Sequence, residues 1–337
     1  MIAKNLKLIL IAVFYVMFLS ILYSLHQRIP LYDRIVNYVA NLNYYRIGFA
    51  LSIASTAFVI ELIAVGWSDS SLRKIFKPTK SAKTDIFLGL LYYLNFGSVL
   101  YFIFSLGTTK FIPAAVKQFF GNGILSEIGN YTVEVIIYLL VVDFLHYVSH
   151  WVSHKIQFVW EIHKYHHSAT DFLIITGNRV HPLEKVFQLY FYLVPLAILG
   201  ASPEMLLIVL VIKNLVDSLQ HSMVNWDYGW IGRWIIFSPI GHRIHHSMEE
   251  EHWDKNFGDI FVFWDRIFGT YYEGSRINNE VGVTDNVYNK GSVLGDLWLS
   301  IRLAFSKFLA SIKTGRWLSE HLYEDYDKKS HSSSLDE

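Results

Sequence analysis

The feature that most constrains this chain is a run of 24 residues, Ile86–Thr109, that contains no charged side chain. A helix rises about 1.5 Å per residue, so about 20 mainly apolar residues cross the roughly 30 Å hydrocarbon core of a bilayer. Similar stretches occur five more times, some of them shorter or carrying one or two charges: Leu8–Leu25, Ile47–Trp67, Tyr131–Val148, Val186–Leu199 and Met205–Leu219. We therefore expect an all-α fold, a polytopic membrane helical bundle with six embedded helices, the last two forming a hairpin.

The composition agrees with a membrane protein. Hydrophobic residues make up 53% of the 337 residues and charged residues only 17%, against roughly 45–50% and 25% in soluble domains. The formal net charge is zero, so we expect no nucleic-acid partner. The chain has no cysteine, which excludes disulfides, thiolate zinc sites and iron–sulfur clusters. Any metal must therefore be held by His, Asn or carboxylate side chains.

Positive charges predict the orientation of the spans. The loop Ser68–Asp85 is rich in basic residues: Arg73, Lys74, Lys77, Lys80 and Lys83. Such loops stay in the cytoplasm, and counting spans from this loop brings His150 and His221 back to the cytoplasmic side. We therefore expect both termini and the histidine-rich part of the chain to face the cytoplasm.

We divide the chain into three regions. Residues 1–130 hold the N-terminal spans, residues 131–272 hold the histidine clusters and the hairpin, and residues 273–337 follow as a polar loop, a helix and a tail. The helix, Leu294–Ile312, is amphipathic and is expected to lie on the membrane surface. The polar tail from Glu320 is expected to be disordered.

Twelve of the 15 histidines fall between His146 and His252. Residues three or four positions apart share one face of a helix. That spacing occurs in four groups: His150 with His154; His163 with His166 and His167; His221 with Asn225; and His242 with His245 and His246. Each group can aim two or three ligand atoms at one point, so these segments are expected to form a metal-binding cap.

The number of ligands predicts the number of metals. The clusters supply nine imidazoles, with Asn225 as a candidate tenth ligand. One octahedral metal takes at most six ligands, and dioxygen needs open positions, so the supply favours two metals. No His-Glu-x-x-His zinc motif occurs, but imidazole suits zinc, copper and iron alike, so spacing alone leaves the metal open.

Four further residues are candidates for supporting the site. His146 and His181 are each as compatible with a ligand as with a supporting or structural role. Asp143 and Asp217 lie one helical turn before histidines and are candidates to accept the second ring N–H, which fixes the tautomer. The Trp264-Asp265-Arg266 stretch is interpreted as a structural turn.

Two stretches resemble the fatty acid hydroxylase/sterol desaturase superfamily. The first, Asp143–Glu184, reads DFLHYVSHWVSHKIQFVWEIHKYHHSATDFLIITGNRVHPLE. The second, Gly241–Tyr272, reads GHRIHHSMEEEHWDKNFGDIFVFWDRIFGTYY, and QHSMVN at Gln220 lies between them. The resemblance implies a non-haem di-iron centre that uses dioxygen to hydroxylate or desaturate a lipid, with residues 131–272 as the catalytic region.

The resemblance also implies a set of metal ligands: His150, His154, His163, His166, His167, His221, His242, His245 and His246. The implied cofactors are two iron ions, with dioxygen as co-substrate. No b-type cytochrome, flavin or Rossmann motif is present, so we expect a separate electron donor: a b-type cytochrome, a ferredoxin or a reduced pterin. The expected location is the bacterial inner membrane or the endoplasmic reticulum.

Two other functions stay open at this point. A zinc-dependent membrane hydrolase would use a metal-bound water as its nucleophile, and a metal or haem carrier would be no enzyme at all. The sequence also leaves the lipid open among sterols, sphingoid bases, fatty acyl chains and alkyl lipids.

Overall fold

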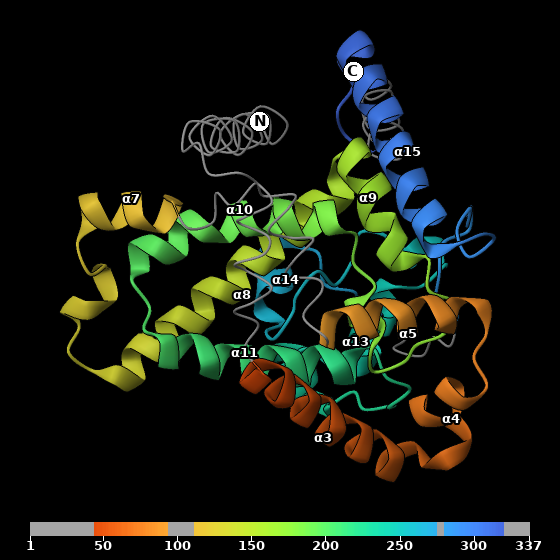
Figure 1. The fold of residues 1–337 in the computed structure, drawn as a ribbon, viewed down its shortest axis with the longest axis horizontal. Coiled ribbons are helices and arrows are strands. Elements are labelled where there is room, and N and C mark those ends of the chain that lie inside the picture. The colour runs from red at the N-terminus through yellow and green to blue at the C-terminus, as the bar shows by residue number, and fades with distance from the viewer. Residues whose placement is uncertain (1–43, 94–110, 275–279, 320–337) are drawn as a thin grey trace, which may run out of the picture.

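The computed structural model describes residues 44–93, 111–274 and 280–319, which form helices and, within these ranges, no β-strand (Figure 1). The α-helices are α3 (Tyr44–Asp69), α4 (Ser71–Phe76), α5 (Lys80–Tyr93), α7 (Phe111–Phe120), α8 (Tyr131–Lys155), α9 (Gln157–His167), α10 (Pro182–Leu199), α11 (Pro203–Gln220), α12 (Gly229–Trp234), α13 (Pro239–His245), α14 (Phe263–Phe268) and α15 (Val293–Thr314). Three short 3₁₀ helices accompany them: η2 (Ile124–Glu127), η3 (Thr176–Asn178) and η4 (Glu250–His252). The expected all-α fold is confirmed.

Three of the described helices are long and apolar enough to cross a bilayer: Ala50–Asp69 within α3, α8 and α10. They correspond to the second, fourth and fifth predicted segments. The sixth segment is a helix, α11, which carries Glu204, Lys213 and Asp217 and is not one of these three. The predicted segment Leu8–Leu25 and most of Ile86–Thr109 lie outside the described residues, as does the predicted tail from Glu320.

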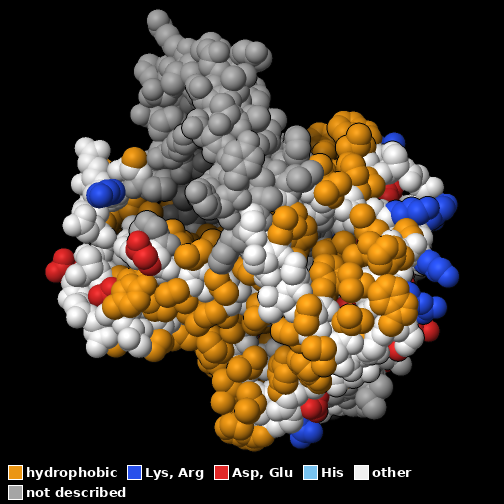
Figure 2. All heavy atoms as spheres, turned by 60° about the horizontal axis from the view of Figure 1, so that its bottom comes forward, with side chains coloured by type: hydrophobic (Ala, Val, Ile, Leu, Met, Phe, Trp, Pro, Cys, Tyr) orange, Lys and Arg blue, Asp and Glu red, His pale blue; other side chains and the backbone are white. Residues whose placement is uncertain are grey.

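The outer surface fits a bilayer environment. Large apolar side chains are exposed on α3 and α11: Leu51, Val59, Ile63, Leu206, Leu207 and Leu210. Figure 2 shows hydrophobic side chains gathered over a broad part of the face on which α3 and α11 come forward, whereas most visible Lys and Arg side chains collect along one edge. Apolar area of this extent on a folded chain marks a surface covered by lipid or protein.

The hairpin of α10 and α11 is formed by residues with matching local preferences. Gly200 ends α10 in a left-handed conformation at φ 71°, which glycine adopts without steric cost. Ser202 then caps α11 by accepting a hydrogen bond from the amide of Met205, and Pro203 occupies the first turn. Gly123 packs on this turn so closely that a Cβ added to it would lie 2.4 Å from the Cα of Gly200.

The predicted amphipathic helix Leu294–Ile312 corresponds to α15, which packs along α9 (Figure 1). Its buried positions are small or polar, with Asp296, Ser300 and Ala304, and Leu297 and Leu299 pack against the buried cluster around Tyr165. The exposed apolar residues fall on one helical stripe: Leu294, Trp298, Phe305, Leu309 and Ile312. An outward apolar stripe agrees with a helix that lies on a membrane surface, and that location stays a prediction.

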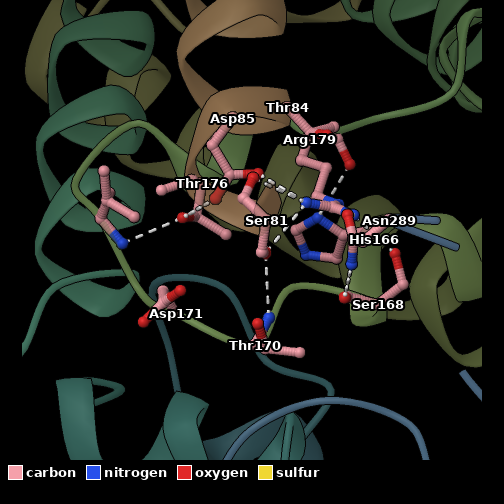
Figure 3. A network of polar contacts seen from close by, with 12 residues as sticks. Ser81, Thr84, Asp85, His166, Ser168, Thr170, Asp171, Thr176, Arg179 and Asn289 are labelled. Carbon is pink, nitrogen blue, oxygen red and sulfur yellow. Dashed lines mark hydrogen bonds and ion pairs between the residues drawn. The ribbon is translucent and has the colours of Figure 1, made fainter. Parts of the chain in front are cut away.

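A buried arginine connects α5, α9 and the segment before α15 (Figure 3). The Arg179 guanidinium donates to the Asp85 carboxylate at 2.9 Å, to the Tyr165 carbonyl at 3.0 Å and to Ser168 Oγ at 2.8 Å. It also donates to Asn289 Oδ1 at 2.6 Å. Both Arg179 and Asp85 are fully buried. The pair therefore joins α5 to the segment that follows the histidine-bearing helix α9.

Asp85→Asn should therefore destabilise the protein strongly. The substitution keeps the size of the side chain but leaves the Arg179 charge buried without its counter-ion, which costs about 3 kcal/mol. The thermal unfolding midpoint of the detergent-solubilised protein measures the loss. Asp69→Asn is the matched control, because the Asp69 carboxylate lies at an exposed helix end and accepts from Ser68. Equal unfolding midpoints for the two variants would contradict the role given to the buried pair.

Candidate metal centre

Four helices direct their carboxyl-terminal ends toward one buried volume. α8 ends where Ile156 becomes extended and is buried with Val152, Val159 and Phe191, and this bend redirects the chain into α9. The histidines lie in the last turns of α8, α9 and α13 or directly after α11 and α13: His150, His154, His163, His166, His167, His221, His242, His245 and His246. The carboxyl end of a helix carries a partial negative charge, so this arrangement favours a cation.

The nine histidines form two groups, and these are the nine residues that the sequence singles out. The five-histidine group is His150, His154, His163, His167 and His245, and the four-histidine group is His166, His221, His242 and His246. Within each group one nitrogen per ring lies within 4.8 Å of those of all the others. The groups are adjacent, because the rings of His167 and His246 stack with centroids 4.1 Å apart.

The ring orientation of five histidines is fixed through Nδ1. Four Nδ1 atoms face backbone carbonyl oxygens. The Nδ1 of His150 lies 3.0 Å from the carbonyl oxygen of Phe257, and that of His166 lies 3.3 Å from the carbonyl oxygen of Arg179. The Nδ1 of His221 lies 2.9 Å from the carbonyl oxygen of Asp217, and that of His245 lies 2.7 Å from the carbonyl oxygen of Lys255. The Nδ1 of His163 faces the Glu184 carboxylate at 2.7 Å. Carbonyl and carboxylate oxygens accept, so each of these Nδ1 atoms carries a hydrogen and Nε2 is the nitrogen that the ring turns inward.

The inward nitrogens meet at short distances. The Nε2 atoms of His166 and His221 lie 3.4 Å apart, and those of His163 and His167 lie 3.1 Å apart. In the first pair both rings donate through Nδ1, so in the neutral tautomer each Nε2 presents a lone pair to the other. Two lone pairs that face each other in a buried volume repel unless a cation lies between them. The geometry therefore fits metal ions.

Burial and unsatisfied atoms lead to the same conclusion. Among the described residues, buried ring nitrogens without a hydrogen-bond partner include Nε2 of His150, Nε2 of His245 and both nitrogens of His246. Burial, reinforced by neighbouring imidazoles, lowers the pKa well below its usual value for four histidines outside the spans: His166, His167, His242 and His246. Burial also lowers the pKa of His245 to about 3. The rings are thus neutral, the protonation state in which imidazole binds metals.

Three of the other candidates take part in different contacts. His181 caps α10, accepts from the Leu183 amide at 3.1 Å and lies outside both groups, so its place is structural. His146 also lies outside both groups, although its ring is 5.5 Å from that of His150. The side-chain oxygen of Asn225, the candidate tenth ligand, accepts a hydrogen bond from Arg243 at 2.6 Å.

The two aspartates differ in what they hold. The Asp217 carboxylate lies 3.3 Å from Nδ1 of His221, as the helical spacing predicts. The backbone carbonyl of Asp217 faces the same nitrogen. Asp143 does not accept from a histidine. It accepts from the amides of Ile260 and Phe261 and from the Trp264 indole, because its position on α8 faces this loop and not the ring cluster.

Asp265 is buried and fixes the same loop, as expected for a structural turn. It accepts from the amides of Phe257 and Gly258 at 2.7 and 2.8 Å, and from Thr270 Oγ1 at 2.7 Å. Burial raises its pKa to about 6 despite these bonds. Since the carbonyl of Phe257 receives the His150 hydrogen, Asp143 and Asp265 position a ligand through the backbone.

Glu184 is a functional residue that the sequence reasoning missed. It is buried, contacts His163 and accepts a second hydrogen bond from Gln188 at 3.1 Å. A carboxylate on the outer ring nitrogen raises the basicity of a ligating imidazole. The available signal was an acidic residue at the start of an otherwise apolar helix, three residues after His181. The carbonyl acceptors leave no signal in the sequence.

Comparison with known proteins places the similarity on this part of the chain. Residues 135–270 match the fatty acid hydroxylase family. Ornithine lipid hydroxylase OlsE of Rhizobium tropici is 29% identical over 156 residues, 46% of this chain and 46% of that protein. Alkylglycerol monooxygenase of Homo sapiens is 31% identical over 132 residues, which are 39% of this chain and 29% of that protein. Cholesterol 25-hydroxylase of Homo sapiens is 27% identical over 138 residues, which are 41% of this chain and 50% of that protein.

The chain thus spans half or less of the length of these curated relatives. No solved structure matches it. The matched region nevertheless holds all nine histidines of the two groups together with Glu184. Through residues 135–270, this chain is therefore similar to the fatty acid hydroxylase family and to curated lipid hydroxylases and monooxygenases.

Proposed function

We propose that this chain is a membrane-bound non-haem di-iron oxygenase that hydroxylates or desaturates a lipid with dioxygen, with residues 131–272 as its catalytic region. The observation that carries the proposal is the division of nine buried histidines into two adjacent groups, in which buried ring nitrogens of His150, His245 and His246 have no hydrogen-bond partner. Nitrogen-rich sites with open positions suit a redox metal. The three relatives are named for different lipids, so they support a lipid substrate without choosing one.

Two iron ions held in these groups would supply the reduction of dioxygen and the removal of hydrogen from an unactivated carbon. The residues of the chain position the ligands and exclude water. Phe257 is fully buried against the rings of His150, His154 and His245. Phe172 is buried against the ring of His221, so both groups have an apolar wall.

Anaerobically purified protein should contain about two iron ions per chain, because each group offers enough ligands for one octahedral ion and open positions. His154→Ala with His245→Ala should remove the ion of the five-histidine group, and His221→Ala with His242→Ala that of the four-histidine group. Elemental analysis by mass spectrometry measures each loss.

His181→Asn is the control for this experiment, because asparagine preserves a helix cap and His181 lies outside both groups. It should keep the full metal content. A single metal per chain in the parent protein, or zinc as the metal of the active form, would count against the di-iron proposal and favour the hydrolase or the carrier.

Turnover should require an external reductant. Hydroxylation of one carbon by dioxygen, with the second oxygen atom leaving as water, needs two electrons beyond those of the C–H bond, and iron only passes them on. A b-type cytochrome, a ferredoxin or a reduced pterin would supply them. Lipid oxidation in membranes should stop when the reductant is withdrawn, and sustained turnover by purified protein without any reductant would contradict the mechanism.

We also propose that the metal centre faces the cytoplasm. The chain has no cysteine, so single cysteines report the side of the membrane cleanly. Lys80→Cys and Thr170→Cys, both at exposed positions, should react with an impermeant maleimide only from the cytoplasmic side. Glu127→Cys, before α8, should react only from the opposite side. Labelling of all three from one side would show that α8 does not cross.

A further inference from the structure

An apolar patch covers the chain between two members of the four-histidine group. The segment from His221 to His242 contains α12, and α14 lies beside it. The large apolar side chains of the patch are each more than a third exposed: Trp226, Tyr228, Trp230, Ile231, Trp234, Ile235, Ile236, Ile267 and Phe268. We call this surface the α12–α14 patch. Side chains of this size gathered on one surface mark an interaction site.

Backbone hydrogen bonds hold the patch in place beside the histidines. The amide of Phe237 donates to the carbonyl of Ile260 at 2.8 Å, and the amide of Val262 donates to the carbonyl of Ile235 at 3.0 Å. The ring of Phe237 is buried and lies 6.1 Å from the ring of His242. The patch is therefore a fixed surface that is connected to the four-histidine group.

The patch lies beside a helix that is apolar and long enough to cross a bilayer. Phe144 of α8 packs against Trp264 and Phe268 of α14, with ring centroids 4.8 and 6.1 Å apart. Phe144 lies eleven residues before Lys155, the only lysine or arginine of α8, which is roughly 16 Å along the helix. The headgroup region is only about 5 to 7 Å deep on each side. With Lys155 at its aqueous edge, Phe144 and the patch lie level with the hydrocarbon core.

The charges of α12 and α14 fit the same location. The two helices carry three charged side chains, of which Asp265 is buried and Arg233 is exposed. The guanidinium of the third, Arg266, lies over the rings of Trp234 and Tyr271, at 3.8 and 3.9 Å from their centroids. Tryptophan and tyrosine gather where bilayer and water meet, and arginine is attracted to anionic headgroups.

We propose that the α12–α14 patch is embedded in the bilayer on the histidine side of the membrane. Its apolar side chains lie at the boundary between headgroups and acyl chains, about 5 to 10 Å deep, and Arg233 lies among anionic headgroups. Lipid is the occupant because the patch continues the apolar surface of α8. The polypeptide between His221 and His242 is then anchored in the bilayer, which fixes the depth of the four-histidine group.

Spin labels on single cysteines test this location, since the chain has no cysteine of its own. Trp230→Cys and Ile267→Cys replace side chains that are 66% and 65% exposed. The full-length labelled protein is placed in nanodiscs of phosphatidylcholine and phosphatidylglycerol, where both faces are open to the solution. Electron paramagnetic resonance then measures how much oxygen, which dissolves in lipid, and a water-soluble nickel chelate each speed relaxation above its value without them.

Both labels should relax faster with oxygen than with nickel. The lipid control is Ile63→Cys, at an 80% exposed position within the apolar helix α3. The aqueous control is Glu250→Cys, at an exposed position of the histidine-bearing region. The ratio of the oxygen to the nickel effect at Trp230 and Ile267 should exceed that at Glu250 about threefold or more, and should indicate a shallower depth than at Ile63.

Two results would overturn the inference. A ratio equal to that at Glu250 would place the patch in water. Weak effects of both reagents, with spectra broadened by a second label, would show that another copy of the chain covers the patch instead of lipid.

A charge placed on the patch tests whether lipid holds it. Trp230→Glu should lower the ratio at a label on Ile267 about threefold, because a carboxylate resists transfer from water into lipid. Trp230→Phe should preserve the ratio. The matched control is Trp253→Glu, which changes a 42% exposed tryptophan outside the patch and should leave the ratio unchanged. Equal ratios for the two glutamate variants would contradict the inference. Neither experiment measures metal content or turnover, so the proposed oxygenase function is tested separately.

Discussion

Imidazole nitrogens that face one another across a buried volume are the constraint on which the rest of this structure depends. His166 and His221 turn Nε2 atoms toward each other at 3.4 Å while both donate through Nδ1. Such a contact is repulsive without a cation. The fold must therefore hold the rings in place with other interactions, and those are found in the helix ends, the backbone carbonyls and the buried carboxylates around them.

The supporting interactions come from parts of the chain that are far apart. Arg179 orients His166 through its backbone carbonyl, and its side chain is fixed by Asp85 of α5. Phe257 orients His150, and its loop is fixed by Asp265 and, at Ile260, by Asp143 of α8. His166 and His150 thus each rest on a carbonyl that a buried charge holds in place. Rings supported in this way keep their geometry before a metal binds, which lowers the entropic cost of binding.

The arrangement also joins the metal centre to the membrane. α8 and α10 are apolar over most of their length. His150 and His154 lie near the end of α8, and Glu184, which contacts His163, lies at the start of α10. A cavity of about 420 Å³ lies there, between the hairpin and the two histidine groups. A second cavity, of about 360 Å³, touches only the five-histidine group.

The sequence by itself determined the helical class, the apolar helices α3, α8 and α10 and the nine histidines, because hydropathy and three- or four-residue spacing are local properties. It also predicted α11 as the second helix of the hairpin, and two of the charges on this helix, Lys213 and Asp217, line the cavity beside the histidines. Only the tertiary structure decided how the histidines divide into five and four, that Asp143 holds a loop, that Asn225 binds Arg243 and that Glu184 supports His163. These contacts join residues on different elements, and their partners are often backbone carbonyls, which every residue carries and no sequence pattern distinguishes.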